Sequence, residues 1–584
     1  MKNLTVNNKV ALALLVLYGA VIPVAVAQAP AQKPKIAVFS GPTATIQNSQ
    51  PLVTSNKARE KYGLPLLRDA AGQPLSDGLY YQRIARPVTV YVEMYTAHPL
   101  ESDVQELYGK PDGYVDAKGN FSKARRSAAD KPVLEVVLKP GDGLYPLPYM
   151  ARQVNGKAWD AEYTEPKAPF SSSRQTFYPN ASRIFEEIER NGGRIKEMAD
   201  YDFYRAAPAG GYTKGLPESK RTDTGTGDIA PEKLGEHFFT YGPYGAAPSR
   251  MVIGRATNMV QQAMNSGKYL GAIWLEGSPS IETTSYWMNL LIDTKSPLVF
   301  NAAQRKRGSI SADGDQNIKD AITFITSRVW SDEQDRSKVG AILMQDQIMY
   351  SSREVQKGDA RPGGYVVTGG HGGIVGTMGY GPKLTFLPVR KHTYQSAVTL
   401  SQLPREVPGI ARREGKPEVV TVPVKDAAGM LLPEAIPMVT LFKSSNWLSD
   451  EVNSKDPSSE VDILARLEDY LTHHPLAGFV GEGTAPYGSL IAPMDAALTK
   501  AALQGFPVLK VARGNADGFM DTNPNNLFIE GQNITATKGM MLLMACILKF
   551  GALPPANDPV NPTAAELQTI KDHIARYQEV FNTH

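Results

Sequence analysis

Short apolar segments recur along much of the chain, and each ends in a polar or glycine-containing turn. The clearest are rich in β-branched residues and span residues 36–39, 270–275, 339–344, 437–442, 478–480 and 507–511. Between several of them lie helical patterns, for example at residues 282–292 and 315–329. This alternation predicts an α/β fold with a largely parallel, buried sheet. Polar residues directly after these strands are the first candidates for a ligand site.

The last helix is predicted from its cap and from its apolar stripe. Thr563 and Glu566 have the spacing of a capping box. Apolar side chains then recur at helical spacing, at Leu567, Ile570, Ile574, Tyr577 and Phe581. We interpret this stripe as core packing.

Two segments lack a strong periodic pattern. Residues 404–434 are rich in proline and charge, which predicts an interdomain linker. Residues from about 83 to 249 are rich in Tyr, Pro, Gly and charge, with strand-like stretches at 88–92 and 133–138 and a helical pattern at 182–198. We interpret this second zone as an insertion or lid on the core.

The N-terminus has the order of features found in an export signal. Lys2 and Lys9 precede an apolar run at residues 10–26, which ends in the small-residue pattern Ala25-Val26-Ala27. This order predicts a secretory signal peptide that is cleaved after Ala27. A retained membrane anchor is the alternative, with a run at the short end of the roughly 17–25 residues that span a bilayer. The expected location is periplasmic or secreted, with no membrane association after cleavage.

Charge, cysteine content and the lack of certain motifs argue against several classes of function. The formal charge of the 584-residue chain is +3, and loss of Lys2 and Lys9 leaves +1, which argues against a nucleic-acid-binding protein. The single cysteine, Cys546, lies in an apolar stretch and is expected to be a buried hydrophobic residue. No metal-ligand spacing or nucleotide-binding motif occurs, so no metal or cofactor is expected.

From residue 271 onward, several motifs follow one another in an order that indicates a protein family. Residues 271–287 contain Glu276-Gly277-Ser278-Pro279 and then Glu282-Thr283-Thr284. Three further motifs follow: Ser311-Ala312-Asp313-Gly314, Arg353-Glu354-Val355-Gln356-Lys357 and Arg390-Lys391-His392-Thr393. The ordered set resembles the HGTDT-x-EET, SADG, RDVTK and RKHT segments of the bacterial L-asparaginase/glutaminase family, in a divergent form similar to type II enzymes. Residues 436–581 are similar in order and spacing to the smaller C-terminal domain of that family.

The resemblance implies an asparaginase-like two-domain fold, with a larger N-terminal sheet domain and a smaller C-terminal α/β domain. We expect a signal peptide at 1–27, an N-terminal domain at 34–403 with the insertion at about 83–249, a linker at 404–434 and a C-terminal domain at 435–584. It also implies a homo-oligomer, either a dimer or a tetramer.

The resemblance further implies a threonine nucleophile at the end of the first strand. The family's loop there contains TGGTI, whereas this chain has Ser40-Gly41-Pro42-Thr43-Ala44-Thr45-Ile46. Matching the Thr-Ile pair selects Thr45 as the nucleophile, and matching the glycine selects Thr43. Tyr62 occupies a stretch comparable to the one that holds the family's assisting tyrosine.

A second constellation is implied by the later motifs. Ser278 stands at the family's second catalytic threonine, Lys357 at its lysine, and Pro279 at its aspartate. Proline cannot accept the charge-assisted bond from a substrate α-ammonium, a bond worth about 1.5–3 kcal/mol. Glu276, which stands where relatives have histidine, is a candidate replacement. We therefore expect Thr43, Glu276, Gly277 and Asp313 to bind the substrate.

The sequence thus predicts an exported amidohydrolase that cleaves a small-molecule carboxamide through a threonine acyl-enzyme and releases ammonia. One alternative is a related hydrolase whose amide or ester substrate lacks an α-amino group. Another is a degenerate small-molecule-binding protein that keeps the fold without turnover.

Overall fold

The computed structural model describes residues 32–40, 249–278, 280–305, 313–368, 373–513 and 524–584. It also describes short stretches between residues 53 and 241. Residues 34–584 form one compact unit.

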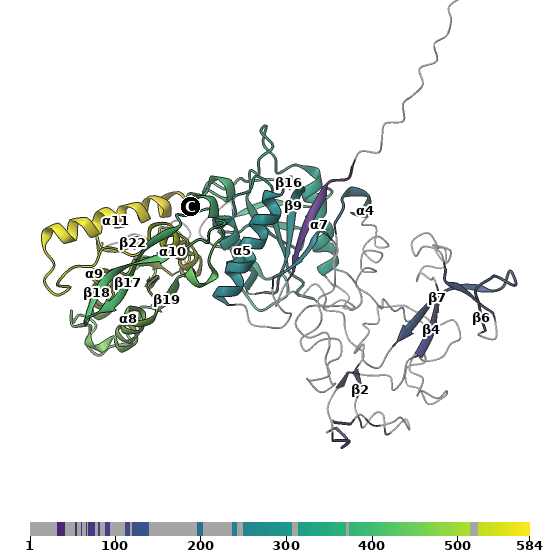
Figure 1. The fold of residues 1–584 in the computed structure, drawn as a ribbon, viewed down its shortest axis with the longest axis horizontal. Coiled ribbons are helices and arrows are strands. Elements are labelled where there is room, and N and C mark those ends of the chain that lie inside the picture. Colours follow the sequence, from purple (N-terminus) through teal and green to yellow (C-terminus); the bar gives the residue numbers. More distant parts are fainter. Residues whose placement is uncertain are drawn as a thin grey trace, which may run out of the picture. The chain divides into compact units, whose positions relative to one another are not determined.

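The larger sheet has eight strands, and its centre is parallel. Two of its strands, β9 and β16, are labelled in Figure 1. In spatial order the strands are β16 (Lys383–Leu384), β15 (Ile374–Thr377), β12 (Ile348–Ser351), β11 (Ala341–Gln345), β10 (Leu298–Asn301), β9 (Tyr269–Leu275), β1 (Lys35–Ser40) and β8 (Phe238–Thr240). Strands β11, β10, β9, β1 and β8 are parallel, and β12, β15 and β16 add an antiparallel edge. The predicted α/β class with a largely parallel sheet is confirmed.

Helices cover both faces of this sheet because its strands are apolar on both sides. Alternate residues of one strand enter different cores. Trp274 packs with residues of α5 (Arg250–Asn265) and α6 (Ser280–Leu291). Ile273 packs with residues of α7 (Gly314–Ser327) on the other side.

The smaller sheet is wholly parallel, with the order β19 (Met438–Lys443), β20 (Ala477–Gly483), β21 (Val508–Ala512) and β22 (Ile529–Glu530). The helices of this part are α8 (Val461–His473), α9 (Ala492–Leu503), α10 (Ala536–Phe550) and α11 (Ala564–Thr583). The capping box of Thr563 and Glu566 is present, and Ile570, Ile574, Tyr577 and Phe581 are buried. The predicted final helix is thus confirmed.

Residues 404–434, the predicted linker, contain a regular hairpin. Strand β17 (Glu406–Arg413) pairs with β18 (Lys416–Pro423) in antiparallel register around a turn at Glu414 and Gly415. Both turn residues have positive φ, which closes the tight connection. The segment lies between the two sheets along the chain, but it is a hairpin and not an extended, irregular connection.

The insertion region contains a separate four-stranded antiparallel sheet. Its order is β4 (Val88–Glu93), β7 (Lys131–Leu138), β5 (Gly113–Val115) and β6 (Phe121–Ser122). Strands β4 and β7 occur where the sequence predicted them. Of the helix predicted at 182–198, the described part is α4 (Ile195–Met198). A short pair, β2 (Val53–Thr54) and β3 (Tyr80–Tyr81), precedes this sheet along the chain.

Four short 3-10 helices complete the described elements outside the sheets: η5 (Thr393–Gln395), η6 (Leu400–Gln402), η7 (Pro433–Ala435) and η8 (Pro457–Ser459).

Candidate active site

Polar side chains gather where the parallel strands of the larger sheet end. Glu276, Gly277 and Ser278 follow β9 directly and lead into α6. Gln304 follows β10, whose last residue, Asn301, lies opposite the last residue of β9. Because carboxyl ends of parallel strands share one edge, these loops are brought together there.

A hydrogen-bonded network joins Ser278 to Lys357 at this edge. The Ser278 side chain hydrogen-bonds with the Tyr365 hydroxyl group. The Gln304 side-chain amide donates to the Tyr365 hydroxyl oxygen at 3.1 Å. The carbonyl oxygen of the same Gln304 side chain accepts from Lys357 Nζ at 2.5 Å. Two of the predicted catalytic residues are therefore connected through Tyr365 and Gln304.

The hairpin of β13 (Val355–Lys357) and β14 (Tyr365–Val367) sets part of this geometry. Lys357 lies directly opposite Tyr365 in the antiparallel register. The ammonium group lies 4.9 Å from the centre of the Tyr365 ring, which favours the cation through the electron-rich ring face. Lys357 Nζ also donates to the backbone carbonyl of Arg361 at 2.7 Å.

Burial shifts the pKa values of Lys357 and Tyr365 in opposite directions. Burial lowers the pKa of Lys357, and the opposing effect of nearby carboxylates does not cancel this shift. Burial raises the pKa of Tyr365 to about 12, so its hydroxyl stays protonated at neutral pH. The lysine is therefore more ready to release its proton than a solvated one, and the tyrosine remains a hydrogen-bond donor. The carboxylates near Lys357 belong to Asp359, Asp313 and Asp346.

Asp313 holds in place the loop that carries Gln304. Its carboxylate is buried and accepts the backbone N–H groups of Gln304 at 3.0 Å and Arg305 at 2.9 Å. It also accepts a hydrogen bond from the Gln345 side chain. These bonds fix the loop after β10, and that loop presents the Gln304 side chain to Lys357.

Glu276 has different partners. Only 3% of the residue is exposed, and its carboxyl group accepts from the Trp274 indole at 2.9 Å and from the Thr284 hydroxyl at 3.3 Å. Burial raises the pKa of Glu276 to about 7. The Trp274 ring in turn stacks on Tyr241, with 4.2 Å between ring centroids. The side-chain partners of Glu276 are thus outside the Ser278–Lys357 network.

Gly277 contributes a backbone group. Its carbonyl oxygen accepts the N–H of Ile281 at 3.3 Å, which starts the first turn of α6. Thr43, Thr45, Tyr62 and Pro279 lie outside the described residues. The last residue of β1, Ser40, pairs with Leu275 of β9, so the chain that leads to Thr43 and Thr45 leaves β1 beside the strand that precedes Ser278.

Sequence reasoning missed Tyr365, Gln304 and Glu282. The backbone N–H of Lys357 donates to Glu282 Oε2 at 2.5 Å, which couples α6 to β13. Glu282 was part of a recognised motif, but its contact with Lys357 depends on tertiary packing. Tyr365 and Gln304 belong to no motif, and only the hairpin register and the loop held by Asp313 bring them to the site.

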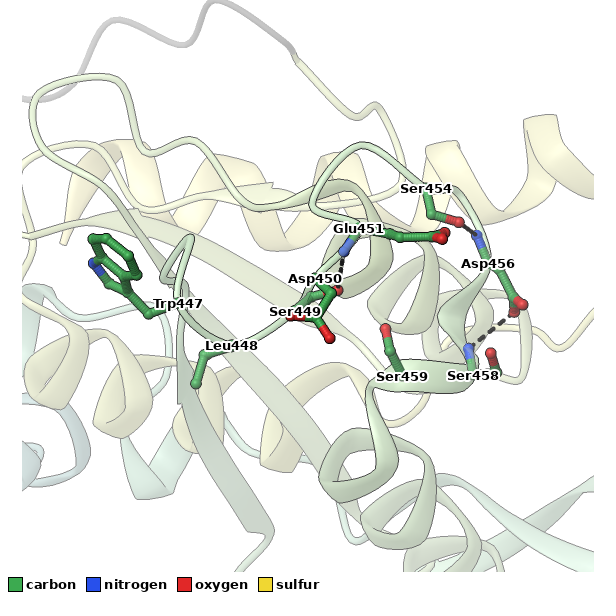
Figure 2. Close-up of a pocket in the computed structure, with 9 residues that line it drawn as sticks. All are labelled: Trp447, Leu448, Ser449, Asp450, Glu451, Ser454, Asp456, Ser458 and Ser459. Carbon is green, nitrogen blue, oxygen red and sulfur yellow. Dashed lines mark hydrogen bonds between the residues drawn. The ribbon is translucent and has the colours of Figure 1, made fainter.

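A separate cavity of about 360 Å³ lies in the C-terminal part, lined by residues between Trp447 and Ser459 (Figure 2). Its polar side chains serve local backbone groups: Ser449 accepts from the N–H of Glu451, and Asp456 accepts from that of Ser458. It shares no residue with the Ser278–Lys357 network.

The described residues hold no group of three or more His, Cys, Asp or Glu side chains arranged to bind a metal ion. Within the same residues, no helix combines the length and apolarity that a membrane crossing requires.

Comparison with known proteins agrees with the motif order. Residues 250–362 match the family model "Asparaginase, N-terminal". The chain is 27% identical over 143 residues to a glutaminase-asparaginase of Acinetobacter glutaminasificans, which covers 24% of this chain and 40% of the relative. It is 29% identical over 68 residues to L-asparaginase 2-3 of Saccharomyces cerevisiae, covering 12% of this chain and 19% of the relative.

Among solved structures, a probable cytoplasmic L-asparaginase from Campylobacter jejuni aligns with a TM-score of 0.45 and 16% identity. The alignment covers 68% of this chain and 91% of that chain.

The matching segment is an asparaginase-type α/β segment, and it contains Ser278, Gln304 and Lys357. This segment is similar to the L-asparaginase/glutaminase family, in agreement with the resemblance of its motifs. The matched region nevertheless spans less than half the length of these curated relatives.

Proposed function

We propose that the protein is an amidohydrolase that cleaves a small-molecule carboxamide and releases ammonia. The observation that carries the proposal is the hydrogen-bonded path from Ser278 through Tyr365 and Gln304 to Lys357, within the family-matched segment. A lysine amine whose pKa is lowered by burial releases its proton more readily than a solvated one, which suits it to proton transfer.

The proposed reaction has two halves, with Thr45 as nucleophile and Thr43 as the alternative. In the first half the threonine oxygen bonds to the amide carbon and the C–N bond breaks. The hydroxyl proton passes to the departing nitrogen, which leaves as ammonia. In the second half a water oxygen attacks the ester carbon, a proton returns to the threonine oxygen, and the acid is released. Ser278 and Lys357 orient this water and relay its proton.

Replacement of the lysine tests the proposal. Lys357→Met removes the amine but keeps most of the side-chain length, so ammonia release from hydrolysed amides should fall by roughly 100-fold or more. Lys383→Met, on the exposed strand β16, is the matched control and should stay near the wild-type rate. A folded Lys357→Met variant with the wild-type rate would contradict the proposal.

One observation favours the alternative substrate class, an amide without an α-amino group. Glu276, the candidate replacement for the missing aspartate, already bonds to Trp274 and Thr284 and is almost fully buried. Its raised pKa also leaves much of it uncharged near neutral pH. An ammonium group therefore gains little from this carboxyl group.

Matched substrates separate the two classes. Succinamate is L-asparagine without its α-ammonium group, so the two amides differ only in the group that distinguishes the two substrate classes. If the alternative class is right, kcat/KM for succinamate exceeds that for L-asparagine. The opposite order assigns the enzyme to amino-acid amides, and lack of turnover with either amide, and with L-glutamine, favours a binding protein.

Location and assembly belong to the same proposal. The N-terminal pattern of charge, apolar run and Ala25-Val26-Ala27 supports export to the periplasm or medium. The family supports a homo-oligomer, a dimer or a tetramer. N-terminal sequencing of protein from an exporting host and light scattering of the purified protein test these two points.

A further inference from the structure

A buried lysine of the C-terminal part reaches the segments that carry the Ser278–Lys357 network. Lys538 lies in the first turn of α10, and only 3% of it is exposed. Burial disfavours an ammonium group, and the first turn of a helix, where backbone N–H groups point outward, disfavours a cation as well. A charged side chain at such a position needs specific compensating partners.

Those partners are two backbone carbonyl groups from different segments. Lys538 Nζ donates to the carbonyl oxygen of Glu282, in the first turn of α6, and to that of Ser352 at 2.5 Å. Ser352 follows β12 and stands five residues before Lys357. The ammonium group also lies 5.7 Å from the centre of the Tyr286 ring. One side chain therefore holds α6 and the entry to β13 at a fixed separation.

Both held segments lead directly to the site. Glu282 accepts from Lys538 through its carbonyl group and from the Lys357 backbone N–H through its carboxylate. The first turn of α6 also follows Ser278 by only a few residues. A displacement of either segment changes the distance between Ser278 and Lys357.

We propose that Lys538 is a positioning residue for the Ser278–Lys357 network, which it holds by bridging the carbonyl groups of Glu282 and Ser352. This inference rests on the proposed amidohydrolase function, although part of its test does not need turnover. Lys538 acts through backbone groups and touches no reacting atom.

Other contacts near Lys538 should keep its variants folded, so that their activity can be measured. Arg353 independently links the same turn to the C-terminal part, through Nε to the carbonyl oxygen of His584 at 2.9 Å and through Nη2 to Asn533 Oδ1 at 2.9 Å. Loss of the Lys538 ammonium therefore leaves other bonds between these parts intact.

The experiment compares Lys538→Met with Lys549→Met. Lys549 lies in the last turn of the same helix and also donates to a backbone carbonyl, that of Gln402, away from the network. Because small misplacements of reacting groups cost up to about 100-fold in rate, kcat for amide hydrolysis should fall by about 10- to 100-fold in Lys538→Met, with KM changed much less. The Lys549→Met variant should retain the wild-type kcat.

A second readout does not depend on turnover. Trace acetylation followed by mass spectrometry measures the reactivity of the Lys357 amine, which its bonds to Gln304 and Arg361 control. We expect this reactivity to change in Lys538→Met and to stay unchanged in Lys549→Met. If the wild-type protein hydrolyses no amide, the proposed function fails, and Lys357 reactivity alone decides whether Lys538 positions the network.

The pH profile adds a signature that a general stabilising role lacks. The titratable groups that face Lys538 are Glu282, Glu354, Arg353 and Tyr286. Burial lowers the pKa of Lys538 to about 7, so the wild-type kcat should decline as the ammonium deprotonates. The variant should lack this decline.

If Lys538→Met does not fold, Lys538→Gln replaces it, because a glutamine amide still donates to one carbonyl group without a buried charge. A folded variant at position 538 with wild-type kcat, wild-type pH profile and wild-type Lys357 reactivity overturns the inference.

Discussion

Glu276 keeps a carboxyl group in the protein interior, bonded to the Trp274 indole and the Thr284 hydroxyl. Its pKa is raised by burial from 4.5 to about 7 in the folded protein. Between these values the folded state binds the proton and the unfolded state does not, so the free energy of unfolding falls as pH rises. The accumulated loss is about 3 kcal/mol above pH 7.

A Glu276→Gln variant should therefore respond differently to pH. Glutamine resembles the protonated acid and never ionises, so the variant gains about 3 kcal/mol relative to the wild-type protein between pH 4.5 and pH 8. Urea denaturation of both proteins at several pH values measures this difference. Parallel curves would show that Glu276 titrates normally in the folded state.

Single residues also show where sequence reasoning ends. Ser278, Lys357 and Asp313 were identified from motifs, and the structure connects all three through Gln304. Tyr365 was missed because its partnership with Lys357 depends on a hairpin register. Strand pairing is a tertiary property that a local pattern does not encode.

At the scale of elements, strands were predictable because a buried parallel strand is a short apolar run. The predicted runs at 36–39, 270–275 and 478–480 lie within β1, β9 and β20. The hairpin of β17 and β18 was not predicted. Its strands alternate between buried and exposed residues only in part, and prolines interrupt the pattern.

Helix α11 allows a quantitative test of a local signal. The Thr563 hydroxyl accepts the N–H of Glu566 at 3.2 Å, and the Glu566 carboxylate accepts the backbone N–H of Thr563 at 2.8 Å. Thr563→Ala should lower the free energy of unfolding by about 1 kcal/mol, because one N–H group of the first turn loses its acceptor. Thr569→Ala, at an exposed position of the same helix, is the control and should cause no comparable loss. Equal denaturation midpoints for the two variants would contradict the role of the cap.

At the scale of the whole molecule, contacts such as those of Arg353 and Lys538 tie the segments of the larger sheet to the C-terminal part. Both parts should therefore unfold in one transition. Cys546, the single cysteine, is buried in α10, and burial raises the pKa of its thiol. Its reaction with a thiol reagent reports unfolding of the C-terminal part.

The change in tryptophan fluorescence on unfolding reports mainly the other part, because Trp274, Trp287 and Trp330 are buried there, whereas Trp447 of the C-terminal part is already exposed. We expect thiol labelling and fluorescence to change at the same denaturant concentration. Two separated transitions would show that the parts unfold independently.

The two-sheet architecture followed from the order of apolar runs and motifs along the chain. The substrate does not follow in the same way. It depends on which side chains face one edge of the larger sheet, and the sequence departs from the family's motif at Pro279.

The most direct measurement is to trap the acyl-enzyme by rapid acid quench during turnover of a hydrolysed amide, followed by intact-mass and peptide mass spectrometry. We expect an adduct with the mass of the acyl group on the peptide that contains Thr45 and Thr43, and fragmentation should assign it to Thr45. Because Lys357 is proposed to act in deacylation, the acyl-enzyme should accumulate further in the Lys357→Met variant. Ammonia release without any adduct on that peptide, or an adduct on another residue, would contradict the threonine mechanism.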